Sequence, residues 1–136
     1  MKLEEFSQDD FERASRRLVR SLTRGKTTSS QPKAILLGGQ SGAGKTTIHR
    51  IKQREFQGNI IIIDGDSYRS FHPNYLGLQE KYGKDSVDYT KVFAGKMVEY
   101  LVDELSKQGY HLLIEGTLRT TEVPRKTAQL LAIRGY

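Results

Sequence analysis

Residues 39–46 match a phosphate-binding loop at every position. They read G-Q-S-G-A-G-K-T, which fits the pattern G-x-x-x-x-G-K-[S/T], with an apolar run before them and a segment of helical character after them. In such a loop the glycines let backbone N–H groups surround phosphate oxygens, Lys45 reaches the β- and γ-phosphates, and the Thr46 hydroxyl ligates Mg²⁺. A glycine-rich turn that matches by chance is the alternative. The predicted nucleotide-binding residues are Gly39, Gln40, Ser41, Gly42, Ala43, Gly44, Lys45, Thr46 and Thr47.

Two aspartates follow directly on the apolar run at 60–63. Asp64 and Asp66 flank a glycine, and we expect their carboxylates at the carboxyl end of a parallel sheet, where open α/β sheets bind ligands. In a phosphoryl-transfer site one such carboxylate accepts the proton of the attacking hydroxyl, and another holds Mg²⁺ directly or through water. The residues alone do not divide these roles between the two. A solvated Asp-Gly turn is the alternative.

A third group of polar residues follows the apolar run at 112–114. Glu115 and Thr117 end this run, and Arg119 comes next within reach of an anion. Because the carboxyl ends of parallel strands meet at one edge, we expect these residues in the same crevice as the phosphate loop, where they would contact substrate or Mg²⁺. A plain turn at the end of a strand is the alternative.

Other polar residues carry weaker signals. His49 follows the phosphate loop and His72 precedes a proline, and neither has a partner at metal-ligand spacing, which favours structural or surface roles. Glu99 lies in a long helical segment, where its spacing alone predicts a solvated side chain.

Residues 13–33 are strongly basic and contain no acid. Acidic residues come just before them. Acidic side chains near the start of a helix and basic side chains near its end both interact favourably with the helix dipole, so we interpret the stretch as a solvated helix face. Nucleic acid is the alternative partner of a basic stretch. No aromatic RNA-binding pattern, zinc finger or heptad series supports it.

Hydrophobic periodicity predicts an α/β fold. Short apolar runs at 34–38, 60–63 and 112–114 are typical of buried parallel strands. Helical spacing predicts helices over 7–24, 45–56, 85–108 and 121–134, with Gly109 capping the third. This order predicts a P-loop kinase-like parallel sheet with helices on both faces. Such folds normally place another strand after the last helix, so we expect an incomplete fold, the N-terminal part of a longer protein.

Length and composition bound the class of protein. The chain has 136 residues, a net charge of +6 and no cysteine. This size predicts one domain, with a helix and linker at 1–32 and a phosphate-binding core at 33–136. No apolar run is long enough to span a bilayer, and the absence of disulfides fits a reducing compartment, so we expect a soluble, cytoplasmic protein without a membrane partner.

Three segments together resemble the zeta toxins of bacterial toxin–antitoxin systems. They are G-Q-S-G-A-G-K-T-T at 39–47, I-D-G-D-S-Y-R-S-F-H-P-N-Y at 63–75 and G-Y-H-L-L-I-E-G-T-L-R-T at 109–120. The resemblance implies a kinase that phosphorylates the 3′-hydroxyl of the amino sugar in UDP-N-acetylglucosamine with ATP or GTP and Mg²⁺, and so inhibits cell-wall synthesis. It also implies a small helical antitoxin that blocks the nucleotide site.

The same resemblance assigns roles to residues. Lys45 and Thr46 would hold nucleotide and metal, and Asp66 would be the general base. The sugar-nucleotide site would be lined by Asp66, Glu99, Glu115, Thr117 and Arg119. The family's later segment supplies arginines that clamp the transferred phosphates. We therefore expect the turnover of residues 1–136 alone to be lower than that of the full-length protein by a factor of about 10³ or more.

Two other functions fit the residues. One is a P-loop kinase that acts on another small hydroxyl substrate. The other is a nucleotide-dependent binding module, or an inactive fragment that engages a partner. Asp66 argues against mere binding, because binding needs no base.

Overall fold

The computed structural model describes residues 2–37, 45–115 and 122–136. Within these ranges the strands β1 (Ala34–Leu37), β2 (Ile61–Asp64) and β3 (Leu112–Glu115) form one parallel sheet in the order β1-β3-β2. The α/β prediction is confirmed, and the second strand is displaced by one residue from the predicted 60–63, so that it includes Asp64.

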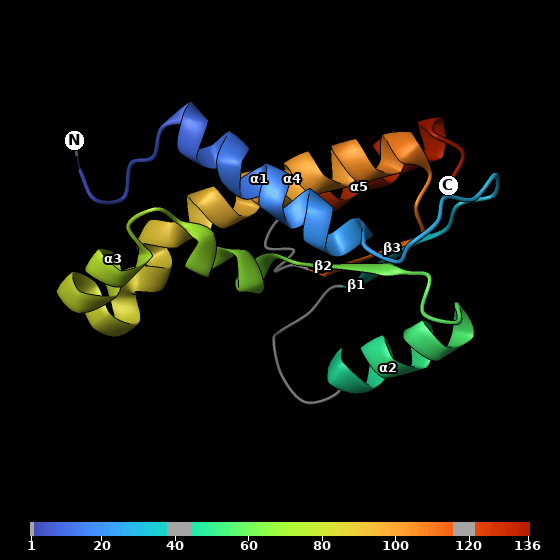
Figure 1. Ribbon diagram of the computed structural model, residues 1–136, viewed down its shortest axis with the longest axis horizontal. Coiled ribbons are helices and arrows are strands. Elements are labelled where there is room, and N and C mark those ends of the chain that lie inside the picture. The colour runs from blue at the N-terminus through green and yellow to red at the C-terminus, as the bar shows by residue number, and fades with distance from the viewer. Residues whose placement is uncertain (1, 38–44, 116–121) are drawn as a thin grey trace.

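Helices lie on both faces of the sheet (Figure 1), as predicted. α2 (Lys45–Glu55) lies on one side, while α1 (Gln8–Thr23), α4 (Val87–Gln108) and α5 (Glu122–Ile133) lie on the other. None of the described helices combines the length and the apolar character that a membrane span requires.

Residues 65–86 contain structure that periodicity does not predict. The 3₁₀ helix η1 (Gly65–Phe71), the helix α3 (Tyr75–Tyr82) and the 3₁₀ helix η2 (Gly83–Ser86) connect β2 to α4. Leu78 is the one buried residue of α3, so a hydrophobic stripe is absent from that helix. Local capping forms η1, because the Asp64 carboxylate accepts a hydrogen bond from the Asp66 backbone N–H.

The core lies between the sheet and the α1–α4 layer. On α4 the four apolar residues spaced four apart, Phe93, Met97, Leu101 and Leu105, are completely buried. The Phe93 ring meets Phe6 and Phe11 edge-on, and burial of each such side chain contributes about 1.5–3 kcal/mol. This layer holds β2, and with it the carboxyl edge of the sheet, in a fixed position.

Gly109 ends α4 in a left-handed conformation, with φ of 90°. A Cβ built there would lie 3.1 Å from the backbone oxygen of Ser29, whose N–H donates to the Gly109 carbonyl at 2.9 Å. We therefore expect Gly109→Ala to lower the free energy of unfolding by about 1–2 kcal/mol. Gly95→Ala, in the open middle of α4, should instead raise it by about 0.5–1 kcal/mol. Urea unfolding of both variants checks the prediction, and equal effects would contradict it.

Candidate functional site

The three strands end level at one edge of the sheet. Leu37 pairs with Glu115, and Glu115 pairs with Asp64 on its other side. The segments that follow β1, β2 and β3 therefore leave the sheet at the same edge, with Glu115 at its centre. The strand ends thus lie at one edge, as expected, while the shared crevice stays a prediction, because residues 38–44 and 116–121 lie outside the described residues.

Part of the predicted site lies outside the described residues. This holds for the loop residues Gly39, Gln40, Ser41, Gly42, Ala43 and Gly44, for Thr117 and Arg119, and for the side chain of Lys45. The described part of the phosphate site is the start of α2. Thr46 and Thr47 are exposed in its first turn, where backbone N–H groups without an acceptor inside the helix and the helix dipole favour an anion.

The two aspartates after β2 occupy different environments. The Asp64 carboxylate accepts hydrogen bonds from the backbone N–H of Asp66 at 3.2 Å and from the Ser67 hydroxyl at 3.1 Å, so it holds the turn. The Asp66 side chain is exposed, and its carboxylate makes no hydrogen bond or ion pair with the described residues. The structure thus engages one carboxylate in folding and presents the other to solvent.

Tyr68 lies beneath this turn and is buried. The Asp64 backbone is near its hydroxyl, but no group in the described ranges meets hydrogen-bond geometry with it, and burial raises the pKa of the phenol. We expect Tyr68→Phe to change the free energy of unfolding by no more than about 0.5 kcal/mol or to raise it, since removal of an unsatisfied hydroxyl loses no bond. Urea unfolding checks this, and a loss above about 1 kcal/mol would show that the hydroxyl does have a partner.

Glu115 is buried and pairs with a histidine of α2. His49 Nε2 lies 2.6 Å from Glu115 Oε2, and the side chains are 23% and 5% exposed. The preference for a structural or surface role for His49 overlooked this contact, because the two residues are 66 positions apart. The available signal was that His49 follows Lys45 by one helical turn and so shares its face.

The other predicted residues fall as follows. Glu99 is exposed on α4, as its spacing predicts. Val98, the residue before Glu99, packs closely on Gly65 between the two aspartates, since a Cβ built at Gly65 would lie 3.1 Å from Val98 Cγ2. His72 is structural, because its ring nitrogens bond the Glu4 carbonyl and the Asn74 N–H.

The residues present fit a Mg²⁺ ion bound mainly by phosphate and water. Within the described ranges no group of three or more His, Cys, Asp or Glu side chains could hold a metal. Mg²⁺ in nucleotide sites is usually held by one or two protein oxygens together with substrate phosphates. The Thr46 hydroxyl, which is exposed in the first turn of α2, is the protein oxygen that such a site would use.

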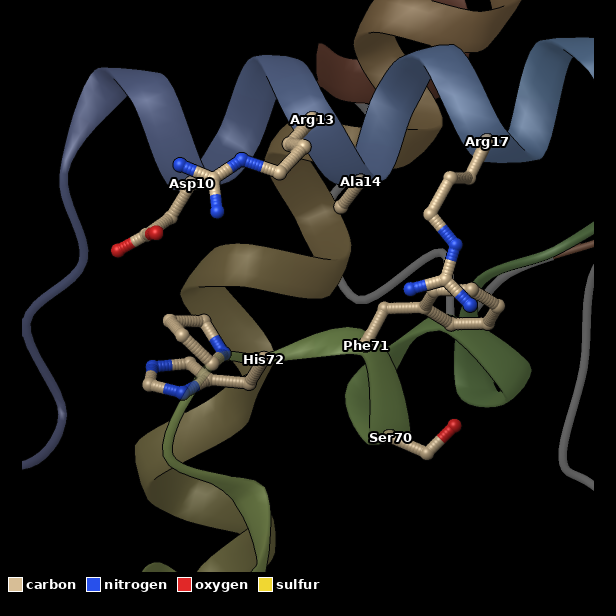
Figure 2. A pocket seen from close by; sticks show the side chains of 8 residues that line it. Asp10, Arg13, Ala14, Arg17, Ser70, Phe71 and His72 are labelled. Carbon is tan, nitrogen blue, oxygen red and sulfur yellow. The ribbon is translucent and has the colours of Figure 1, made fainter.

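A separate hollow of about 360 Å³ lies between α1 and the end of η1 (Figure 2). Arg13 and Arg17 project into it from successive turns of α1, and Ser70, Phe71 and His72 form its other side. None of the predicted site residues lines it. Both arginines are exposed, as expected for a solvated helix face.

Comparison with known proteins finds one family. The family model described as Zeta toxin matches residues 18–136. "Toxin PezT" of Streptococcus pneumoniae serotype 4 is 69% identical over 136 residues, which are 100% of this chain and 54% of that protein. "Toxin zeta" of Streptococcus pyogenes is 42% identical over 131 residues, which are 96% of this chain and 46% of that protein.

A solved structure of similar fold also comes from a toxin–antitoxin system. It comes from a study of the PezAT chromosomal toxin–antitoxin system of Streptococcus pneumoniae, with a TM-score of 0.96 and 70% identity. The match covers 100% of this chain and 56% of that one. The chain thus spans about half the length of the curated relatives it matches.

Proposed function

This chain belongs to the zeta toxin family, and we propose that it carries the nucleotide and base half of a kinase toxin. The proposed reaction transfers the γ-phosphoryl group of ATP or GTP to the 3′-hydroxyl of UDP-N-acetylglucosamine. The observation that supports it most is the exposed carboxylate of Asp66, which follows β2 and makes no hydrogen bond or ion pair with the described residues. A module that only binds nucleotide has no use for such a group.

The described residues divide the chemistry between the two reactants. Backbone N–H groups of the first turn of α2 would bind and orient the phosphates, the Thr46 hydroxyl would hold Mg²⁺, and Lys45 would bind the γ-phosphate. When bound, Mg²⁺ neutralises charge on the phosphate oxygens. Positioning and electrostatics supply most of the rate enhancement of phosphoryl transfer.

Asp66 acts on the acceptor. Its carboxylate takes the proton of the 3′-hydroxyl as the oxygen forms a bond to the γ-phosphorus, and the bond from that phosphorus to the bridging oxygen breaks. The products are the 3′-phosphorylated sugar nucleotide and a nucleoside diphosphate. Glu115 lies beside Asp64 at the same edge, and in the proposed reaction it accepts a hydrogen bond from the sugar.

We further propose an antitoxin as protein partner. The solved neighbour comes from a toxin–antitoxin study, and the curated relatives are named as toxins. A kinase that consumes a cell-wall precursor needs such a partner, because its free activity would inhibit growth.

An acceptor panel tests the proposed reaction. The protein is incubated with γ-labelled ATP or GTP and Mg²⁺, and with UDP-N-acetylglucosamine, its analogue without the 3′-hydroxyl, free N-acetylglucosamine or a nucleoside. We expect label on UDP-N-acetylglucosamine alone. Label on another acceptor would favour the alternative kinase, and nucleotide binding without any transfer would favour the binding module.

A further inference from the structure

The contact between His49 and Glu115 joins two parts of the proposed site. His49 lies on α2 one turn after Lys45, and Glu115 is the last residue of β3. The nitrogen and oxygen are 2.6 Å apart, as in a charge-assisted hydrogen bond. The helix that begins the phosphate site therefore also contacts the carboxylate at the centre of the sheet edge.

Burial makes this contact consequential. The Glu115 side chain is 5% exposed, and a carboxylate withdrawn from water requires donors that stabilise it. The strand itself does not depend on the pair, because β3 is bonded to β1 and β2 on both sides. The contact thus acts on the direction of the carboxylate rather than on the position of the strand.

We propose that His49 is a positioning residue, which orients the Glu115 carboxylate to accept a hydrogen bond from the sugar nucleotide. The inference rests on the proposed function and adds to it a residue that contacts neither reactant. A carboxylate has about four acceptor sites, so the bond from His49 leaves capacity for a substrate hydroxyl. An imidazole anchored on a helix restricts the carboxylate to one orientation before the substrate arrives.

The test separates positioning from folding. Isothermal titration calorimetry measures the affinity of the chain for UDP-N-acetylglucosamine, with a non-hydrolysable ATP analogue present, so that no turnover is needed. We expect His49→Ala to weaken this affinity by about 10- to 100-fold while the affinity for the ATP analogue changes less than about twofold. His49→Gln, whose Nε2 amide can still donate to Glu115, should retain most of the affinity.

Two further variants complete the design. Gln53→Ala removes an exposed polar side chain one turn further along α2 and should have no effect. In a Glu115→Ala background, His49→Ala should cause no additional loss, because it acts through Glu115. Thermal melts confirm that each variant is folded.

The measured affinities can overturn the positioning role of His49. Unchanged sugar-nucleotide affinity in a folded His49→Ala variant would overturn the proposal, and so would an additive loss in the Glu115→Ala background. A loss of ATP-analogue affinity instead would assign His49 to the nucleotide side. If the unsubstituted chain binds no UDP-N-acetylglucosamine, the proposed acceptor fails, and the positioning role for that acceptor fails with it.

Discussion

Lys45→Ala is expected to reduce phosphoryl transfer to background, a loss of at least about 10³-fold, and to abolish growth inhibition in cells that lack the antitoxin. Lys45 is the first residue of α2, and the phosphate-loop pattern assigns its ammonium to the β- and γ-phosphates. Charge that develops on the transferred group loses its fixed counter-charge in the variant. Transfer from γ-labelled ATP to UDP-N-acetylglucosamine and growth on induction measure the effect.

A second lysine on the same helix provides the control. Lys52 lies on α2 and forms an ion pair with Glu55 at 2.9 Å, a surface contact worth no more than about 1 kcal/mol. Lys52→Ala should therefore leave transfer and growth inhibition unchanged. Nucleotide affinity gives a readout without turnover, and Lys45→Ala should weaken it by about tenfold or more. Growth inhibition that persists in a folded Lys45→Ala variant would remove the phosphate-loop assignment.

The sequence predicts the elements with strong local signals. The four apolar residues spaced along α4 form its buried stripe, and Gly109 caps that helix as expected. Short runs of β-branched and leucine residues become the parallel strands, as predicted. The expectation of burial holds at every position of β3 but is wrong for β1, which is half-buried with Leu36 exposed. These signals depend only on neighbouring residues, so they can be read without the tertiary structure.

Features that depend on distant pairs are not predicted. The spacing does not give the strand order β1-β3-β2, which places Glu115 at the centre of the edge. It also does not give the contact of His49 with Glu115, because helix and strand meet only in the folded chain. η1 and α3 lack a hydrophobic period: the Asp64 side chain caps η1, and α3 has one buried residue, Leu78, and no side-chain cap. The roles of the site residues stay predictions until the variants are measured.

Asp66→Asn is expected to lower turnover by about 10²- to 10⁴-fold with little change in nucleotide affinity. The amide keeps the shape of the side chain but accepts no proton from the acceptor hydroxyl. Because Asp66 is exposed and its side chain makes no bond within the described ranges, the substitution should leave the free energy of unfolding within about 0.5 kcal/mol of its original value. Asp88→Asn, on the exposed face of α4, matches the change of charge and should retain full turnover.

The different environments of Asp64 and Asp66 allow this prediction to distinguish which of the two is the general base. Asp64 already accepts bonds from the Asp66 N–H and the Ser67 hydroxyl, and both bonds hold its carboxylate toward the turn. A proton acceptor for the sugar must instead reach outward, as the exposed carboxylate does. If Asp66→Asn loses nucleotide or Mg²⁺ affinity together with turnover, Asp66 belongs to the metal site and Asp64 becomes the candidate base. If only turnover falls, the carboxylate acts on the acceptor, and its solvent-facing position after β2 is the reason that it can.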